Sequence, residues 1–345
     1  MILSIADGFN NRVTPGANNI SLQRISSSYK TWKDIQKKSG SEYQVSREWL
    51  PIYSKFMQTI IKSLNDGDLL SLKRMYENFF REPFSTGLHG LHFEMVERYM
   101  DKNISPSNED LAIYLKNCMS YAQNFLLSCR NVPVSALFRP SIGNSYGYTL
   151  DGCNVFAGAE YHYYYAQKIR LLLKEHISPT VMELGGGFGG MAYYLLRDFP
   201  GVKYIGVDLP ENAALQAYYL MSHFPHLNIK LWNEPGIFDE DMTYDAYIMP
   251  NFAIPSLQEN SITLSFNSYS LAEMSIESIN NYIKIICSIT KKYIYHLNHV
   301  YWEVSADNFP INFEKFELLF RNPTMWGKDT SRYDLDHHEF LYIAR

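Results

Sequence analysis

The glycine-rich segment VMELGGGFGG at residues 181–190 constrains the fold of this 345-residue chain more than any other part of the sequence. An apolar run ends in an acidic residue, Glu183, and glycines follow it closely before a helical pattern that starts near Met191. Glycine is needed where the backbone takes a positive φ or approaches a ligand too closely for a Cβ atom. A turn of this kind between a parallel strand and a helix holds amide N–H groups beside a nucleotide. The segment therefore predicts an α/β domain with a nucleotide-type cofactor at the turn.

Two cofactor fingerprints fit the same glycines. Gly185, Gly187 and Gly190 satisfy the G-x-G-x-x-G pattern of dinucleotide binding. Read with Glu183 and Gly189, the segment instead resembles the acidic-x-G-x-G-x-G pattern of class I methyltransferases that use S-adenosyl-L-methionine (SAM). A carboxylate before the turn would repel the pyrophosphate of NAD but attract the ammonium and sulfonium groups of SAM. The prediction is SAM, with NAD and a purely structural glycine turn as the alternatives.

A second acidic residue supports a nucleotide at this position. The apolar run 202–208 ends at Asp208, about 20 residues beyond Gly187, the interval at which a carboxylate at the tip of the second strand binds ribose hydroxyls. The other predicted cofactor contacts also follow the ends of strands. The full predicted set is Glu183, Gly185, Gly186, Gly187, Gly189, Asp208, Leu209, Asn233 and Pro250.

Strand and helix patterns alternate after residue 160. Strands are expected at 180–184, 202–208, 228–232, 244–249 and 293–297, and helices at 160–173, 191–197, 210–223 and 276–290. This alternation predicts a parallel, doubly wound sheet. The last two strands, 316–321 and 340–344, have only a polar loop between them, which is too little for a parallel crossover. They should therefore pair as an antiparallel hairpin, which argues against a dinucleotide enzyme.

The chain divides into three expected regions. Residues 1–45 form a polar lead-in without sustained periodicity, residues 46–135 a helical N-terminal region, and residues 136–345 the cofactor domain. Helices are expected at 48–65, 69–80 and 91–100, and from Ser105 onward. His89, in the loop 84–90, is expected to be a surface histidine.

Composition excludes several classes of protein. A formal net charge of −5 provides no basic surface for nucleic acid. The four cysteines include no C-x-x-C pair, which argues against a disulfide framework or a zinc site. Neither a basic leader followed by an apolar run nor a stretch of ~18 apolar residues is present, so we expect a cytoplasmic protein without a transmembrane segment.

Candidates for acceptor chemistry follow the carboxyl ends of the strands, because ligands of open α/β sheets bind there. His296 and His299, each either a general base or a structural histidine, and Glu273, either a base or a first-turn helix acid, are the catalytic candidates. The stretch with Asp334, Asp336, His337 and His338 is either a metal cluster or a solvated hairpin loop. The solvated loop is the prediction, and no metal is predicted. The predicted substrate-binding residues are Arg139, Asn144, Tyr161, Asn267 and Asn298.

Three segments together resemble a known family. Residues 183–190, 208–211 and 267–274, with Tyr295 and Asn298, are similar to the sugar O-methyltransferases of bacterial polysaccharide and lipopolysaccharide biosynthesis. The resemblance covers roughly residues 135–345 and departs from the pattern at Ser145, where proline is expected. It implies a Rossmann-like, seven-stranded class I methyltransferase sheet whose last strand is antiparallel.

The resemblance also implies an activity. The chain would transfer a methyl group from SAM to a sugar hydroxyl of a bacterial surface glycan or of its nucleotide- or lipid-linked precursor. The alternatives are a non-catalytic methyltransferase-like partner in a glycan assembly complex and an NAD-dependent sugar-modifying enzyme. The helical N-terminal region lies outside the resemblance and is a candidate surface for homo-oligomer formation.

Overall fold

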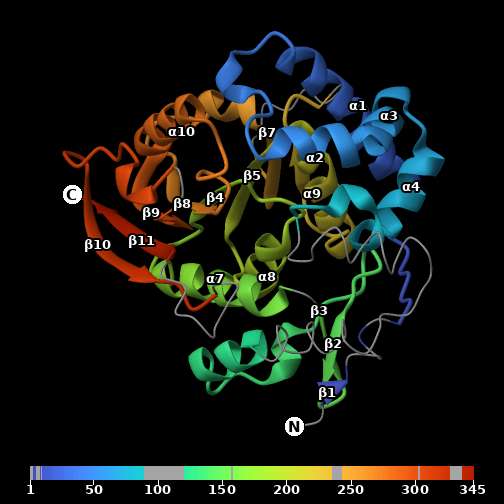
Figure 1. Cartoon of the computed structure of the whole chain (residues 1–345), viewed down its shortest axis with the longest axis horizontal. Helices are drawn as coiled ribbons and strands as arrows, with labels where there is room; N and C mark the ends of the chain where they lie inside the picture. Colours follow the sequence, from blue (N-terminus) through green and yellow to red (C-terminus); the bar gives the residue numbers. More distant parts are fainter. Residues whose placement is uncertain are drawn as a thin grey trace.

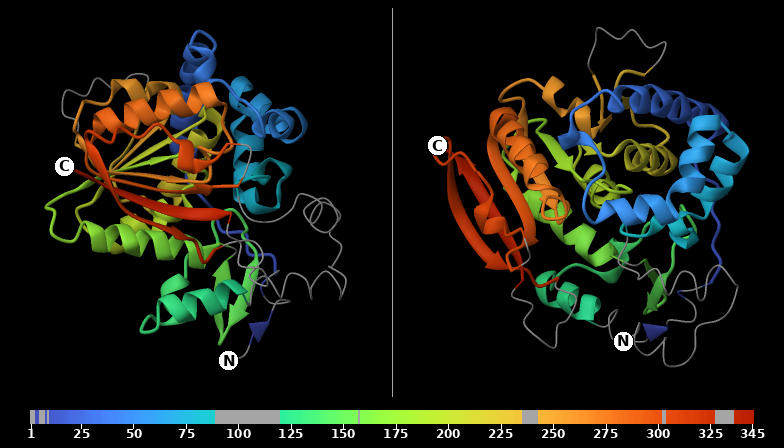
Figure 2. Two further views of the ribbon diagram at one scale, coloured as in Figure 1. Left: turned by 60° about the vertical axis from the view of Figure 1, so that its left-hand side comes forward. Right: turned by 45° about the horizontal axis from the view of Figure 1, so that its top comes forward.

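The computed structural model describes residues 3–4, 8, 10–88, 120–156, 158–234, 243–301, 304–326 and 336–345. A central sheet has helices on both of its faces, and the N-terminal helices lie beside one end of it (Figures 1 and 2). Helix α10 covers one face and α7 the other, as Figure 2 shows. The helices of this domain are α7 (Ala159–Leu172), α8 (Gly190–Asp198), α9 (Pro210–His223) and α10 (Ile276–Ile289).

Within the described residues, the main sheet has eight strands in the order β10-β11-β9-β8-β4-β5-β7-β6. The six strands from β9 to β6 pair in parallel, whereas β11 pairs antiparallel with both β9 and β10. The strands are β4 (Thr180–Leu184), β5 (Lys203–Asp208), β6 (Ile229–Leu231), β7 (Ala246–Pro250), β8 (Ile262–Ser268), β9 (Thr290–His299), β10 (Phe316–Pro323) and β11 (His337–Ala344).

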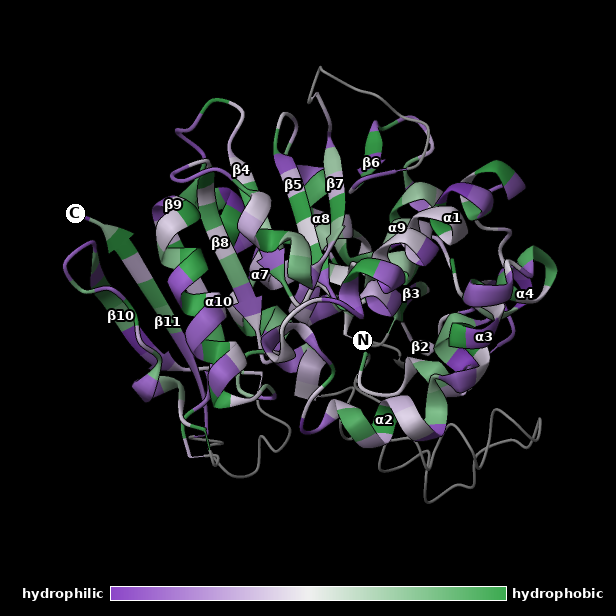
Figure 3. Cartoon of the chain, turned by 90° about the horizontal axis from the view of Figure 1, so that it is seen from above, coloured by the Kyte–Doolittle hydropathy of each residue, from purple (hydrophilic) through white to green (hydrophobic). Residues whose placement is uncertain are grey.

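This topology confirms the predicted fold class, a Rossmann-like class I methyltransferase sheet with a reversed last strand. The described sheet has eight strands where seven were expected, and the additional one is β8. Figure 3 shows β4, β5 and β7 side by side, with α1, α3 and α4 beyond the β6 edge.

Strand β8 was not predicted, although residues 262–267 alternate strictly between apolar and polar. The structure buries six of its seven residues, so the polar positions are covered as well as the apolar ones. The structure places β8 directly beside β4, whereas the predicted strand 244–249, here β7, lies on the far side of β5. The turn after β4 is therefore flanked by the ends of β5 and β8.

The expectation that residues 1–45 form an irregular lead-in is wrong. Helix α1 (Asn19–Gln36) begins at an N-cap in which the Asn18 side chain accepts a hydrogen bond from the Ser21 amide at 2.9 Å. It packs on α9 and buries Leu22, Ile25, Tyr29 and Trp32. The apolar stripe of this helix is narrow, and the serine, lysine and glutamine residues around it obscure the helical periodicity in the sequence.

Helices also form most of the described residues in the rest of the N-terminal region. The expected helix 48–65 divides into α2 (Trp49–Phe56) and α3 (Gln58–Asp66), and α4 (Leu69–Glu77) follows. Residues 120–128 are helical, whereas the predicted helix 91–100, the start of the next one and His89 lie outside the described residues. The small sheet of β1 (Leu3–Ser4), β2 (Gly147–Leu150) and β3 (Cys153–Phe156) was not predicted.

Residues 41–49 of the N-terminal region cross the carboxyl edge of the main sheet. The Ser278 hydroxyl donates to the Glu42 carbonyl at 2.9 Å, and the Asn251 amide donates to the Tyr43 carbonyl at 3.0 Å. The Trp49 indole donates to Glu273 at 2.9 Å. Among the helices of the described residues, none is long and apolar enough to cross a membrane.

Candidate functional site

The glycine turn after β4 adopts a backbone that only glycine tolerates easily. Gly185, Gly187 and Gly189 have φ values of 76°, 54° and 93°. A Cβ atom on Gly185 would lie 2.1 Å from the Ser270 hydroxyl oxygen, so the turn also passes close to the end of β8. The turn leads directly into α8, as the sequence predicted.

Asp208, at the end of β5, is oriented by the glycine turn. Its Oδ2 accepts a hydrogen bond from the Gly187 amide at 2.8 Å, and its Oδ1 accepts from the Leu209 amide at 2.7 Å and the Asn212 side chain at 3.0 Å. Burial raises the pKa of Asp208 to about 6, although these three hydrogen bonds oppose the shift. The nearby Glu273 carboxylate raises it further.

Glu183, at the end of β4, is a second buried carboxyl group. Its Oε2 accepts a hydrogen bond from the Tyr204 hydroxyl at 2.6 Å. Burial raises the pKa of Glu183 to about 8; the hydrogen bond from Tyr204 lowers it and the charge of Asp208 raises it. Across the described part of the chain, neither carboxyl group forms an ion pair, although buried charges are normally paired. The carboxyl groups at the ends of β4 and β5 would therefore attract a ligand that carries positive charge.

The other predicted cofactor residues do not all lie here. Pro250 is the register partner of Asp208 in the pairing of β5 with β7, so it reaches the same edge. Asn233 is exposed and follows the edge strand β6, with β7 between it and β5. Because β7, and not β6, neighbours β5, the residues after Pro250 lie closer to Asp208 in the sheet than Asn233 does.

Asn267 and Asn298 connect strands instead of facing an open site. Both are buried, and the Asn298 amide donates to Asn267 Oδ1 at 2.9 Å. Asn267 donates to the Leu184 carbonyl at 2.8 Å, and Asn298 Oδ1 accepts from the Ala272 amide at 3.1 Å. In this structure the two side chains join the ends of β4, β8 and β9, and their substrate-binding role stays a prediction.

The two predicted histidine bases lie on opposite faces of β9. His296 is 1% exposed and stacks on Phe340 with 4.7 Å between ring centroids, and burial lowers its pKa to about 3. This core position disfavours a role for His296 as a base, which stays a prediction. His299 lies at the strand end, partly exposed, with Nδ1 2.7 Å from Asp336 Oδ2. Glu273, the third candidate, holds the Trp49 indole.

Aromatic side chains line the end of β8 beside His299. The Tyr161 hydroxyl hydrogen-bonds to the Ser268 hydroxyl, and its ring stacks on Tyr269 with 6.1 Å between centroids. Tyr269 has a φ of 63°, which is strained for a bulky residue, and its ring centroid is 5.0 Å from that of His337. Tyr161 is thus the predicted substrate-binding residue that the structure places beside the catalytic candidates.

Arg139 and Asn144 lie away from this edge. The Arg139 side chain is fully buried, with its guanidinium 5.6–5.8 Å from the ring centroids of Phe80, Phe156 and Phe188. Asn144 is buried and accepts a hydrogen bond from the Arg12 amide at 2.9 Å. Both residues connect the loop before β2 to neighbouring segments of the chain. Their buried positions do not favour direct contact with a substrate.

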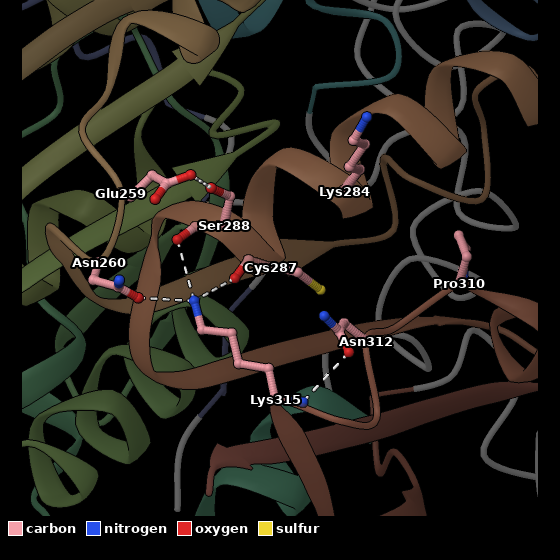
Figure 4. A pocket seen from close by; sticks show the side chains of 8 residues that line it. All are labelled: Glu259, Asn260, Lys284, Cys287, Ser288, Pro310, Asn312 and Lys315. Carbon is pink, nitrogen blue, oxygen red and sulfur yellow. Dashed lines mark hydrogen bonds between the residues drawn. The ribbon is translucent and has the colours of Figure 1, made fainter.

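A cavity of about 330 Å³ lies at the opposite end of the sheet (Figure 4). One of its charged residues, Lys315, donates from Nζ to Asn260 Oδ1 at 2.8 Å and to the carbonyls of Cys287 and Ser288 at 2.6 and 3.2 Å. These bonds satisfy the ammonium within the chain. The cavity is lined by Glu259, Asn260, Lys284, Cys287, Ser288, Pro310, Asn312 and Lys315, at the amino ends of β8 and β9.

No protein-family model matches the chain. No curated protein matches it either. Among solved structures, similarity extends over about half of the chain. Magnesium protoporphyrin IX methyltransferase from Synechocystis PCC 6803, with bound S-adenosylhomocysteine (SAH), has 9% identity and a TM-score of 0.39 over 54% of this chain and 84% of that one.

Two further solved structures show the same level of similarity. A SAM-dependent methyltransferase from Aquifex aeolicus has 12% identity and a TM-score of 0.33 over 52% of this chain and 88% of that one. A chain in the complex of the Haloferax volcanii Trm112 methyltransferase activator with a methyltransferase has 14% identity and a TM-score of 0.37, over 54% and 92% of the two chains. The fold assignment rests on the strand order of the chain itself.

Proposed function

We propose that this chain is a SAM-dependent O-methyltransferase that methylates a sugar hydroxyl of a bacterial surface glycan or of its nucleotide- or lipid-linked precursor. The observation that carries the proposal is the pair of buried carboxyl groups, Glu183 and Asp208, on either side of the glycine turn. Neither is ion-paired within the described residues, and a bound cation would compensate their negative charge.

The residues at this edge fit SAM better than NAD. SAM carries an ammonium and a sulfonium group and, when bound, supplies the methyl group that an acceptor oxygen attacks. Glu183 would hold the ammonium end, and Asp208, already oriented by the Gly187 and Leu209 amides, would accept the ribose hydroxyls. A pyrophosphate at the same turn would face two carboxylates, which is unfavourable in a buried site.

A sugar acceptor is supported by the side chains at the ends of β8 and β9. Tyr161 and Tyr269 offer aromatic faces on which the apolar face of a sugar ring can stack, and His299 and Asp336 offer polar groups to its hydroxyls. The resemblance to sugar O-methyltransferases indicates the same acceptor class. Cytoplasmic location belongs to this proposal, because nucleotide-linked precursors would be the substrate there.

Two other expectations receive less support. The NAD-dependent alternative meets the charge conflict at the turn. Homo-oligomer formation through the N-terminal region stays a prediction; the described helices α1 and α3 bury apolar residues against their own chain.

Calorimetry with SAM and with SAH tests the cofactor. We expect both to bind the wild-type chain at one site, and NAD not to bind. Mass spectrometry of the surface glycan with and without the gene tests the acceptor, because loss of the gene should remove the mass of one methylene group from a sugar residue. Absence of SAM and SAH binding would refute the proposal. Binding without turnover on any glycan or nucleotide sugar would favour a non-catalytic partner.

A further inference from the structure

Three potential metal ligands meet beside the aromatic side chains at the carboxyl end of β9. His299, Asp336 and His337 each bring one ligand atom, and these atoms lie within 4.8 Å of one another. Two of the three, His299 and His337, are cross-strand partners in the pairing of β9 with β11, and their ring centroids are 4.3 Å apart. The sequence suggested a solvated stretch at residues 334–338, but strand pairing brings two of its side chains against His299.

The backbone holds this cluster in place. The Asp336 Oδ1 atom accepts hydrogen bonds from the Tyr301 amide at 2.7 Å and the Val300 amide at 3.2 Å. Its other oxygen, Oδ2, is directed to His299 Nδ1 at 2.7 Å. Because the carboxylate is fixed to the turn after β9 and the histidines to adjacent strands, the three groups approach one another without a flexible loop between them.

The donor set selects a class of ion. Two imidazoles and one carboxylate are typical of zinc and related first-row divalent ions, whereas Mg²⁺ and Ca²⁺ prefer oxygen ligands. Three protein ligands leave at least one coordination position open, which is the arrangement of catalytic sites and not of closed structural ones. Metal–ligand bonds of about 2.0–2.2 Å require the three side chains to close by small rotations.

We infer that His299, Asp336 and His337 bind a divalent transition ion such as Zn²⁺, with its open position toward the sugar acceptor. Tyr269 contacts the His337 ring and stacks on Tyr161, so the ion would lie next to the aromatic side chains that fit a sugar. An ion there would coordinate the acceptor hydroxyl and lower its pKa, and the proton would leave to water.

This inference rests on the proposed function and changes one part of it. His299 becomes a ligand instead of the general base that the sequence suggested. The competing explanation is an ion-free His299–Asp336 pair in which the histidine accepts the proton. That pair accounts for the 2.7 Å contact, whereas an ion would also use the His337 ring that strand pairing places beside His299.

Cobalt(II) provides a direct readout, because its visible absorption reports ligand number and geometry. The full chain is stripped with EDTA and titrated with Co²⁺, and Zn²⁺ binding is followed by calorimetry. We expect one Co²⁺ site with an intense visible band, displaced by Zn²⁺. His337→Ala and Asp336→Ala should weaken Zn²⁺ binding by at least about 10- to 100-fold, as loss of ligands and their supporting partners does.

His338→Ala is the matched control, since His338 is an equally buried neighbour on the next position of β11. It should leave the Co²⁺ spectrum unchanged, and thermal unfolding of all variants checks the fold. A wild-type chain that shows no Co²⁺ band, or a band that persists in His337→Ala, overturns the inference, as does methylation that survives EDTA. A chain that binds Co²⁺ through these residues but not SAM keeps the metal site and refutes the proposed function.

Discussion

The two ends of the main sheet differ in how the charged side chains there are satisfied. At the amino end, the Lys315 ammonium makes three hydrogen bonds to the chain, two of them to main-chain carbonyls (Figure 4). At the carboxyl end, Glu183 and Asp208 are buried with raised pKa values and no ion pair among the described residues. The Lys315 charge is satisfied within the chain, whereas the two carboxyl groups have no ion pair among the described residues. In an open α/β sheet, the carboxyl end is where a ligand binds.

Loss of Asp208 should have the largest effect on cofactor affinity. In Asp208→Ala, two charge-assisted hydrogen bonds to the ribose would disappear, each contributing about 1.5–3 kcal/mol, so we expect SAM affinity to fall by at least about 100-fold. Calorimetry measures the change. Asp245→Ala is the matched control, since Asp245 binds the Asn228 amide at the amino end of the neighbouring strand and should leave SAM affinity unchanged. Equal losses in the two variants would remove the distinction between the two ends.

A side chain at the glycine turn should disturb both stability and binding. Gly185→Ala combines a φ of 76° with a Cβ atom 2.1 Å from the Ser270 hydroxyl. We expect its free energy of unfolding to fall by roughly 2–4 kcal/mol, from backbone strain and steric overlap together, and SAM binding to be lost.

Gly201→Ala isolates the backbone component of that cost. Gly201 has a φ of 82° but nothing within 4 Å of a Cβ, so denaturant unfolding should show a loss of only about 1–2 kcal/mol. If Gly201→Ala lowered the free energy of unfolding as much as Gly185→Ala does, the contact between a Cβ at Gly185 and Ser270 would contribute nothing to the loss.

The raised pKa of Glu183 predicts a cofactor affinity that depends on pH. With a pKa of about 8, this carboxyl group is mostly protonated at neutral pH, and a bound cation favours its ionised form. Binding therefore releases a proton, and SAM affinity should rise by up to about tenfold per pH unit between pH 6 and 8, then level off.

Calorimetry in two buffers with different ionisation enthalpies measures the released proton. Glu183→Gln is the control, which should bind more weakly and release correspondingly fewer protons. The same reasoning predicts that the cofactor-free chain loses stability as pH rises from about 5 to 8, because its folded state holds protons that the unfolded state releases. A pH-independent affinity would show that Glu183 is not the partner of the cofactor's charge.

The smallest effect on binding is expected at the other end of the sheet. Lys315→Met keeps most of the apolar stem but removes three hydrogen bonds, so unfolding should become easier by about 1–2 kcal/mol. SAM affinity should stay within about twofold of the wild-type value, as expected for independent, well-separated sites. A clear loss of affinity would mean that the two ends are coupled through β8 and β9.

Local patterns predicted much of the fold. Residues 180–184, 210–223 and 276–289 combine clear periodicity with a cap, a proline or a glycine at their boundaries, and the structure places elements there. Strand β8 and helix α1 were missed for different reasons. The apolar–polar alternation over residues 262–267 does indicate a strand, so the signal for β8 was available in the sequence, whereas serine and lysine around α1 dilute its apolar stripe.

Some features of the candidate site could be predicted from the sequence, and others depend on the tertiary structure. The sequence by itself determined the glycine turn, Glu183 and Asp208, because short-range backbone geometry and strand-end position need only neighbouring residues. Only the tertiary structure decided the roles of the two histidines on β9. His296 faces the core and His299 the edge, since strand pairing sets which face is covered.

Tertiary structure also joined His299 to Asp336 and His337, which lie about 40 residues further along the chain and meet it only through the antiparallel register of β9 and β11. Such contacts depend on which strands become neighbours, a property of the whole sheet that no local pattern of residues contains.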